Sequence, residues 1–302
     1  MPVVIILGLV AALFFVPTIG GLARVFSPVP IIFVYLTRGK IAGLILIALV
    51  FGVILSLKGV GQALLFFAGD AVMALIISET IVYRMSFDKS ILFGALGSWA
   101  LSLVLVVALF SGGEVPIIDY FQKEIEQYSQ QSLQTLETMG EDKETLAAMR
   151  DFSQEISRTL ASAFPFFIFS GALLGGILNY LLVRFLWTRF YGPGLFSPEK
   201  FSDWIFPEQF VWVLIGSGGL YLLAGGFIEM LSMNVFLGML TMYFFQGLAV
   251  AIHILRAKNV PVVVWGLMIA MVLFQPLLVG AVIGVGVFDL WGDFRKLKTR
   301  PS

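Results

Sequence analysis

The chain has 302 residues, of which 59% are hydrophobic and 13% are charged, and its mean hydropathy is +0.97. A soluble domain would carry about a quarter charged residues, so this composition excludes an ordinary water-soluble protein. Nineteen basic and nineteen acidic side chains cancel, and no cysteine is present. We therefore expect no nucleic-acid partner, no disulfide, no thiolate metal site and no cysteine nucleophile.

Apolar runs comparable in length to the thickness of a bilayer recur along the whole chain. A spanning helix needs about 20 mostly apolar residues, because backbone amides in hydrocarbon must find their partners within the helix. The runs cover residues 2–22, 25–37, 41–57, 60–81, 90–111, 161–187, 209–228, 235–255 and 260–288. We predict an all-α fold, a polytopic transmembrane helix bundle of eight or nine membrane segments. The first run lacks a basic n-region, so we expect an uncleaved span.

Residues 1–111 form an N-terminal group of segments, and the second segment is unusually short. The motif Pro28-Val29-Pro30 leads into a run of about a dozen apolar residues that ends at Arg38-Gly39-Lys40. Such a run is too short for an upright span. Two interpretations are open: a short or re-entrant helix broken at the prolines, and an ordinary short span that begins with proline.

Residues 112–160 are the one long polar stretch, with ten carboxylates and four basic side chains. Their apolar positions recur every three or four residues, which indicates two helices, and Gly140 followed by Glu141-Asp142 indicates the turn between them. We predict an acidic helical hairpin outside the membrane. Its apolar stripes either pack on each other or lie on the membrane surface, and binding of a partner protein is the alternative.

Residues 161–290 supply the C-terminal membrane segments, and residues 291–302 form a basic tail. The connector at residues 189–208 is rich in aromatic side chains, which favour the level of the lipid headgroups. If every apolar run crosses the membrane, most Lys and Arg of the connectors fall on one side, which favours that side as cytoplasmic. The basic tail would then lie on the opposite side. The conflict disappears if one run is not a simple crossing, and residues 260–288, interrupted by Gln275-Pro276, are a candidate.

Four polar side chains within the apolar runs are the candidate ligand-binding residues: Asp70, Asn179, Gln246 and His253. An ionisable group in hydrocarbon costs about 2.5–3.5 kcal/mol, so Asp70 either faces a polar bundle interior or takes part in solute binding or proton coupling. Gln246 and His253 are seven residues apart and share a helix face. These two and Asn179 either hydrogen-bond between helices or line a ligand cavity.

We expect no catalysis: Ser217 with His253 superficially resembles an intramembrane serine protease dyad, but Ile215 stands where such enzymes have glycine. His253 is the only histidine, and no carboxylates are spaced to complete a metal site around it, so we expect no metal and no cofactor. Phosphate-binding loop, HExxH and paired-cysteine zinc motifs are absent. Small residues at four-residue spacing, Gly171/Gly175 and Gly280/Gly284 among them, predict close approach of membrane helices.

Two patches resemble a known family. Residues 201–212 read FSDWIFPEQFVW and residues 286–297 read GVFDLWGDFRKL; with the early Pro28-Val29-Pro30, these are similar to the YybS-like family of bacterial polytopic membrane proteins, whose domain has no known function. That family is distantly similar to the substrate-binding membrane subunits of energy-coupling-factor transporters. The resemblance implies a bundle with a ligand cavity and an ATPase partner. Those subunits dock the coupling subunit through an Ala-x-x-x-Ala motif on their first span, whereas the first apolar run of this chain has only Gly8-x-x-x-Ala12.

The sequence therefore favours a multi-pass protein of the bacterial inner membrane that is not an enzyme. The first hypothesis is a transporter-like protein that binds or moves a small solute. The second is a structural or assembly protein that engages other envelope proteins through its hairpin, connector and tail. Expected partners are the lipid bilayer and a membrane protein or ATPase. The transporter hypothesis expects the four candidate side chains to converge on one cavity.

Overall fold

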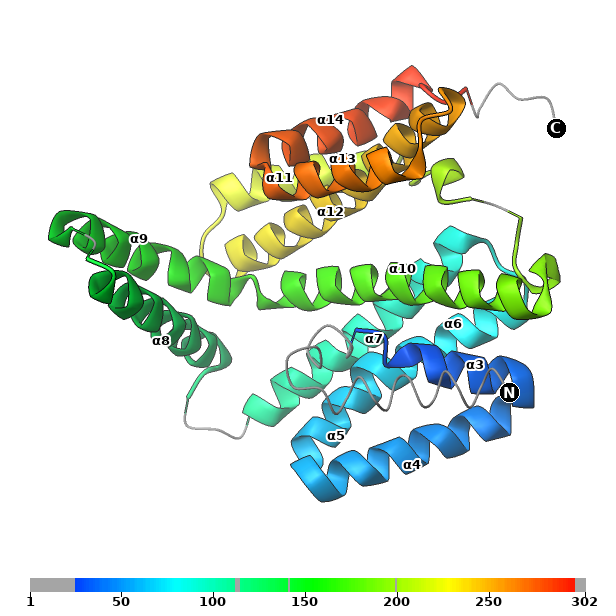
Figure 1. The fold of residues 1–302 in the computed structure, drawn as a ribbon. Coiled ribbons are helices and arrows are strands. Elements are labelled where there is room, and N and C mark those ends of the chain that lie inside the picture. Colours follow the sequence, from blue (N-terminus) through cyan, green and yellow to red (C-terminus); the bar gives the residue numbers. More distant parts are fainter. Residues whose placement is uncertain (1–24, 112–114, 141, 199, 297–302) are drawn as a thin grey trace.

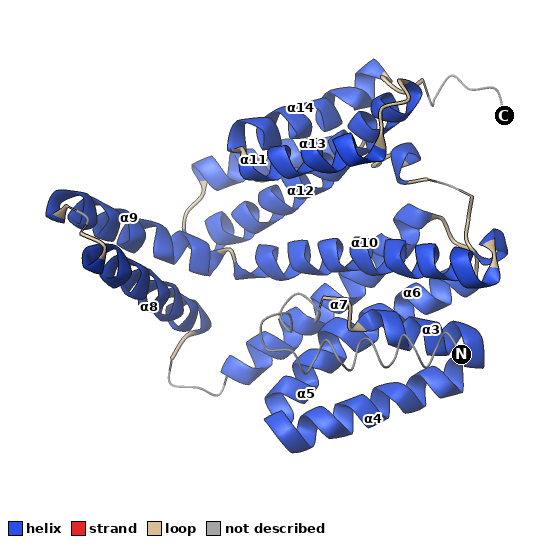
Figure 2. Ribbon diagram, in the orientation of Figure 1, coloured by secondary structure: helices blue, strands red, loops and turns tan. Residues whose placement is uncertain are grey.

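The computed structural model describes residues 25–111, 115–140, 142–198 and 200–296. Within these ranges the chain is helical and contains no strand (Figure 2). The first predicted run, residues 2–22, lies outside the described residues. The helical elements are α3 (Pro28–Arg38), α4 (Lys40–Lys58), α5 (Val60–Phe66), η1 (Phe67–Ala71), α6 (Val72–Val82), α7 (Phe87–Phe110), α8 (Ile117–Thr138), α9 (Lys143–Ser162), α10 (Phe164–Tyr191), η2 (Pro193–Leu195), η3 (Phe201–Asp203), α11 (Phe210–Leu223), α12 (Gly226–Ala257), α13 (Val262–Phe274) and α14 (Pro276–Gly292).

Five segments are long and apolar enough to cross a membrane: α4, the continuous segment α5–η1–α6, α7, α10 and α12. The pair α13 and α14 makes a sixth if it is counted as one bent span, and α3 and α11 are shorter apolar helices. Only 11% to 44% of each apolar window in the five segments is buried within the protein. The predicted all-α fold is confirmed for the described residues, and the five or six candidate spans fit a helical membrane bundle, whereas the number of eight or nine segments stays a prediction.

The long helix α10 lies between two groups of helices (Figure 1). On one side it contacts α3, α6 and α7, and on the other it contacts α12. The short α3 is central to the first group, because Val29, Ile32 and Phe33 are at most 2% exposed. At about 1.5 Å per residue its 11 residues extend about 16 Å, roughly half the hydrocarbon thickness. Prolines occupy its first turn, as expected for a helix that begins with them.

The second group is built around α12, against which α14 packs backbone to backbone. A Cβ atom added at Gly247 would lie 1.9 Å from the carbonyl oxygen of Val282, and one added at Gly286 would lie 2.0 Å from that of Tyr243. This contact differs from the one that the sequence predicts. Nothing lies within 4 Å of a Cβ placed on Gly280 or Gly284, so the predicted pair does not form the close helix approach.

The C-terminal apolar run is not a straight crossing. The axes of α13 and α14 are bent by 109° at the predicted interruption, where Gln275 has extended backbone angles and Pro276 begins α14. Proline has no backbone N–H to continue the preceding helix, which explains the break. The chain returns toward the end of the bundle where α12 finishes (Figure 1).

Helices α8 and α9 pack on each other as a hairpin that projects from the bundle (Figure 1). The large apolar side chains buried in it are those of Leu133 and Leu146, and Ser153 Oγ donates to Ser129 Oγ at 2.6 Å across the pair. The turn places Gly140 at a φ of 90°, a left-handed conformation that glycine adopts without strain. Several apolar side chains of the hairpin remain exposed: Tyr128, Met139, Met149 and Phe152.

Candidate functional site

Asp70 lies in the middle of the span formed by α5, η1 and α6. This span runs from Val60 to Val82, so at about 1.5 Å per residue Asp70 is about 15 Å along the axis from one end and about 18 Å from the other. The surrounding backbone, Phe67–Ala71, is a π-helix, a distortion that is frequent at functional sites. The Asp70 side chain is partly buried.

Two serines of α7 face this π-helix. The hydroxyl of Ser98 donates a hydrogen bond to the backbone oxygen of Gly69 at 2.8 Å. A Cβ atom added to Gly69 would lie 4.0 Å from the hydroxyl of Ser102, one turn further along α7. Both serines are buried, at 2% and 8% exposed. The middle of this helix pair is therefore polar, although both helices are apolar over most of their length.

Asn179 is wholly buried in α10 and links two parts of the chain. Its side-chain amide donates to the backbone oxygen of Val25 at 2.8 Å and to that of Gly175 at 2.7 Å. The first bond ties α10 to the segment just before α3. In hydrocarbon such a bond satisfies a carbonyl that has no water to pair with. These contacts fit the interpretation of Asn179 as a hydrogen bond between helices.

Gln246 lies in α12 and is 1% exposed, with both ends of its amide paired. Its Oε1 accepts a hydrogen bond from the backbone N–H of Phe206 at 3.0 Å. Its Nε2 donates to Asp289 Oδ2 at 3.3 Å. Gln246 thus joins the aromatic connector to the last turn of α14.

A buried ion pair completes this arrangement. Arg295 Nη2 lies 2.7 Å from Asp289 Oδ2, and the side chains of these residues are 1% and 5% exposed. The second terminal nitrogen of Arg295, Nη1, donates to the backbone oxygens of Ser202 at 2.9 Å and Trp204 at 2.7 Å. Asp289 Oδ1 accepts from the backbone N–H of Phe294 at 3.0 Å. Arg295, Asp289 and Gln246 therefore fasten the chain beyond α14 to the connector.

Sequence reasoning missed Asp289 and Arg295 as partners. Arg295 belongs to the stretch predicted as a basic tail, where charged side chains are normally solvated, yet it is buried. Because Asp289 follows an apolar run, its carboxylate needed a partner. The sequence offers no means of choosing the arginine six residues later or of placing it against a connector 91 to 93 residues earlier.

A small pocket lies beside this network, between the start of α7 and the connector. Its volume is about 270 Å³, and it is lined by Ser86, Phe87, Asp88, Lys89, Lys200, Asp203, Trp204 and Ile205. His253 of α12 is not part of the lining, but its Nδ1 lies 3.9 Å from Oδ1 of the lining residue Asp203. Arg256 Nη1 donates to Ser202 Oγ at 3.4 Å and its guanidinium stacks over Trp265.

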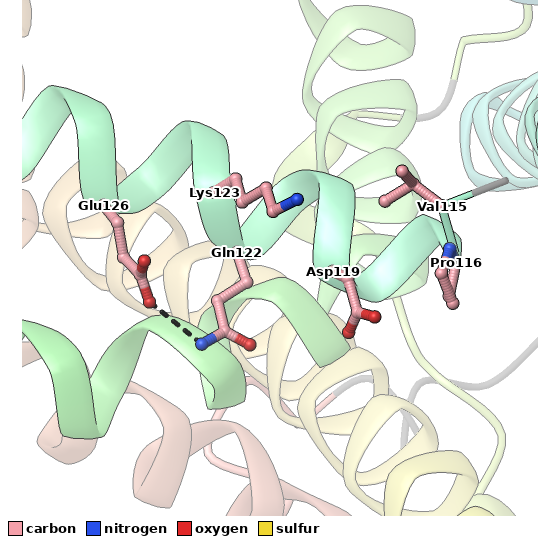
Figure 3. Close-up of a pocket in the computed structure, with 6 residues that line it drawn as sticks. All are labelled: Val115, Pro116, Asp119, Gln122, Lys123 and Glu126. Carbon is pink, nitrogen blue, oxygen red and sulfur yellow. Dashed lines mark hydrogen bonds between the residues drawn. The ribbon is translucent and has the colours of Figure 1, made fainter.

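A second hollow lies at the start of the hairpin, with a volume of about 430 Å³ (Figure 3). It follows one face of α8, where Gln122 Nε2 donates to Glu126 Oε1 at 2.9 Å and Lys123 lies between two carboxylates. The same Glu126 oxygen accepts from Ser157 Oγ of α9 at 3.2 Å. The bonds of Glu126 lie within the hairpin and help to hold its two helices together.

The sequence matches the family described as "Predicted membrane protein (DUF2232)" over residues 3–290. The chain belongs to this family. No curated protein and no solved structure matches it. The family description supports a membrane protein. It includes neither the YybS-like grouping nor a relation to energy-coupling-factor transporters, and both stay predictions.

In this DUF2232 chain the four sequence-predicted residues have separate surroundings. Gln246 and His253 both meet the connector, Asn179 holds the start of α3, and Asp70 lies on the π-helix. Neither of the two pockets above has any of these four side chains in its lining, and neither does a third pocket along α9, between Asp142 and Phe152. Among the residues that the structure describes, no group of three or more His, Cys, Asp or Glu could hold a metal ion.

Proposed function

We propose that this DUF2232 protein is a non-enzymatic, transporter-like protein of the bacterial inner membrane that binds or moves a small solute, with Asp70 at the centre of that activity. The observation that carries the proposal is a carboxylate at the middle of a span, on a π-helix. A carboxylate there costs about 2.5–3.5 kcal/mol on insertion, so its presence favours a role that uses the charge.

The surroundings of Asp70 support this role. Binding sites of secondary transporters lie near the bilayer midplane, where a helix is irregular and its backbone groups serve the ligand. Here the irregular turn faces Ser98 and Ser102, which offer hydroxyl groups at the same depth. A solute that carries a positive charge or a hydrogen-bond donor suits this combination of carboxylate and hydroxyls.

The test compares solutes that co-purify from native membranes with the wild type and with Asp70→Asn, identified by mass spectrometry. We expect a small molecule on the wild type and at least about tenfold less on the variant, the size expected for a lost hydrogen bond to a charged group. Asp119→Asn on the exposed hairpin is the matched control and should retain the solute. Equal retention by Asp70→Asn, or no retained solute on the wild type, would contradict the proposal.

The proposed orientation places the connector and the chain beyond α14 on the cytoplasmic side. Arg295 bonds to the connector, and Arg256 at the end of α12 does so as well, so these basic residues share one end of the bundle. The 109° bend between α13 and α14 supports this orientation, because a run that does not cross straight through can return the tail to the side of the connector. Positive residues in short loops mark the cytoplasmic side. Reporter fusions after residue 302 and in the turn at Gly140 should report opposite sides of the membrane.

A second candidate function, assembly with another envelope protein, rests on the hairpin. Tyr128 and Phe152 are 67% and 65% exposed, although they belong to the apolar stripes of α8 and α9. Residues 112–160 also carry ten carboxylates against four basic side chains, which disfavours an anionic membrane surface and favours a basic protein surface. On this hypothesis the partner is a protein with a basic, partly apolar face.

Cross-linking in native membranes tests this second function. Tyr128→Ser combined with Phe152→Ser should reduce the yield of a cross-linked partner, and added salt should reduce it further because exposed charges are screened. Asp70→Asn should leave the cross-link intact if assembly is the function. A cross-link that the hairpin double variant does not change would contradict it.

A further inference from the structure

The pocket between the start of α7 and the connector contains two positive and two negative side chains. Lys89 and Asp88 come from α7, and Lys200 and Asp203 come from the connector. Within the described residues no ion pair joins the lysines to the carboxylates; Asp203 Oδ1 instead lies 3.9 Å from Nδ1 of His253, which is outside the lining. The pocket therefore presents charges of both signs that the fold does not pair with each other.

The backbone at this place adds further hydrogen-bond donors. The first N–H groups of α7 have no carbonyl acceptor within the helix, because the residues four positions earlier lie before it, and such free donors favour an anion. Ser86 occupies the N-cap position, but its side chain makes no capping hydrogen bond. Its hydroxyl is buried and has no hydrogen-bond partner within the described residues. Helix α7 has 24 residues, so its N-terminus carries the positive partial charge of a long helix dipole.

The pocket also lies at one end of a candidate membrane span, where lipid headgroups are expected. Helix α7 is a candidate span that begins at Phe87, one of the lining residues, so the pocket is at the boundary of that span. Trp204 forms part of its wall, and tryptophan is typical of the interface between membrane and water. Phe87 and Trp204 contact each other edge to face, with ring centroids 6.4 Å apart. A lipid headgroup can therefore reach the pocket from the membrane.

We infer that this pocket binds a zwitterionic phosphoethanolamine headgroup of a membrane lipid. The phosphate would be held by Lys89, Lys200 and the start of α7, and the ammonium by Asp88 and Asp203. A simple anionic headgroup would meet two carboxylates with no positive group to offer them. A phosphocholine group lacks the N–H donors that carboxylates accept. The volume, about 270 Å³, is below the range of drug-sized sites, about 300–1,000 Å³, and suits a small polar group.

Native mass spectrometry of the full chain in detergent tests this inference with four probes. They are dioleoyl-phosphatidylethanolamine, dioleoyl-phosphatidylglycerol, dioleoyl-phosphatidylcholine and soluble phosphoethanolamine. We expect one molecule of phosphatidylethanolamine to be retained at least tenfold better than either other lipid. Weaker but measurable binding of soluble phosphoethanolamine would support the headgroup chemistry. Tighter binding of phosphatidylglycerol, or equal binding of all three lipids, would overturn the inference.

Variants assign the charges to the two ends of the headgroup. Lys89→Gln combined with Lys200→Gln should lower retention of phosphatidylethanolamine at least tenfold, whereas Lys89→Arg should retain it. Asp88→Asn should remove the preference for phosphatidylethanolamine over phosphatidylglycerol. Lys123→Gln combined with Lys143→Gln, on the hairpin, is the control for loss of positive charge and should bind as the wild type does. Unchanged binding by the Lys89/Lys200 double variant would overturn the inference; because Asp70 is untouched, the proposed solute binding stands or falls separately.

Discussion

The connector end of the bundle and the hairpin use charged residues in opposite ways. At the connector end, Asp289 and Arg295 are nearly inaccessible to solvent, and both Nη atoms of the arginine donate to acceptors of the chain. On the hairpin most charged side chains are exposed, and the helices meet through a few buried residues such as Leu133 and Leu146. Buried charge fixes one geometry because every alternative leaves it unpaired, whereas exposed charge leaves the hairpin surface free for other contacts.

Removing the arginine should give the largest loss of stability. Arg295→Met leaves Asp289 and two connector carbonyls without their donor, and breaking a buried pair from one side costs about 3–5 kcal/mol. Thermal unfolding in detergent measures the loss. Arg150→Met, on the exposed face of α9, is the control and should change the free energy of unfolding by no more than about 0.5 kcal/mol.

A double variant sharpens this result. Asp289→Leu combined with Arg295→Met removes both charges, and such replacements are often neutral or stabilising. The double variant should therefore be more stable than Arg295→Met alone. Equal stability of the two would mean that the unpaired carbonyls of the connector, and not the unpaired carboxylate, dominate the cost.

The hairpin should respond to loss of its small core without affecting the bundle. Leu133→Ala removes a side chain that is 7% exposed, and substitutions of this kind cost about 2–5 kcal/mol. Hydrogen exchange should then become faster in α8 and α9 and stay unchanged in α12. Met139→Ala, at a side chain 77% exposed, is the matched control. Faster exchange in α12 would show that the hairpin and the bundle unfold together.

Glycine substitutions test the close contact between α12 and α14. Gly286→Ala places a Cβ 2.0 Å from the Tyr243 carbonyl oxygen, so the helices must separate, at a cost of about 1–3 kcal/mol. Gly284→Ala adds a Cβ with nothing within 4 Å and should be neutral. Thermal unfolding of the two variants side by side decides which glycine forms the contact.

Local features of the fold could be predicted from the sequence because their causes are local. The run at residues 41–57 becomes α4, Lys40–Lys58, since a helix in hydrocarbon must satisfy its amides within itself. The interruption at Gln275-Pro276 becomes the 109° bend because proline cannot continue a helix. In both cases one short stretch of sequence decides the outcome.

Contacts between distant parts of the chain could not be predicted in the same way. Gly280 and Gly284 have the four-residue spacing that predicts close packing, yet a Cβ added at either would have nothing within 4 Å. The close contact is made by Gly247 and Gly286, which lie on two different helices, so no spacing within one helix indicates it. Arg295 belongs to a stretch whose basic composition is typical of a solvated tail, and its burial depends on where the connector lies. For the candidate site, the seven-residue spacing places Gln246 and His253 on one helix face, but it does not indicate the connector residues that they contact, Phe206 and Asp203.

The smallest expected effect is a pH dependence at the start of α9. Asp142 accepts hydrogen bonds from the backbone N–H groups of Glu144 and Thr145, at 3.1 and 3.2 Å, and these bonds hold the pKa of its carboxyl below the ordinary value of 3.8. A lowered pKa in the folded state means that the carboxylate stabilises the folded hairpin fully above pH 3.8. That contribution is lost as the pH falls below 3.8 through the lowered pKa.

Hydrogen exchange of the α9 amides, measured from pH 6 down to about pH 3 and corrected for intrinsic exchange rates, should show this loss, since the carboxyl of the unfolded chain has the ordinary pKa of 3.8. Asn also caps helices well but does not titrate, so Asp142→Asn should keep the cap and remove the pH dependence. A wild-type hairpin whose opening does not change over this range would mean that Asp142 caps α9 without contributing to its stability. In that case the buried residues and the hydrogen bonds between the two helices would hold α9 on α8 without help from the Asp142 charge, which would make the contrast with the ion-paired connector end sharper still.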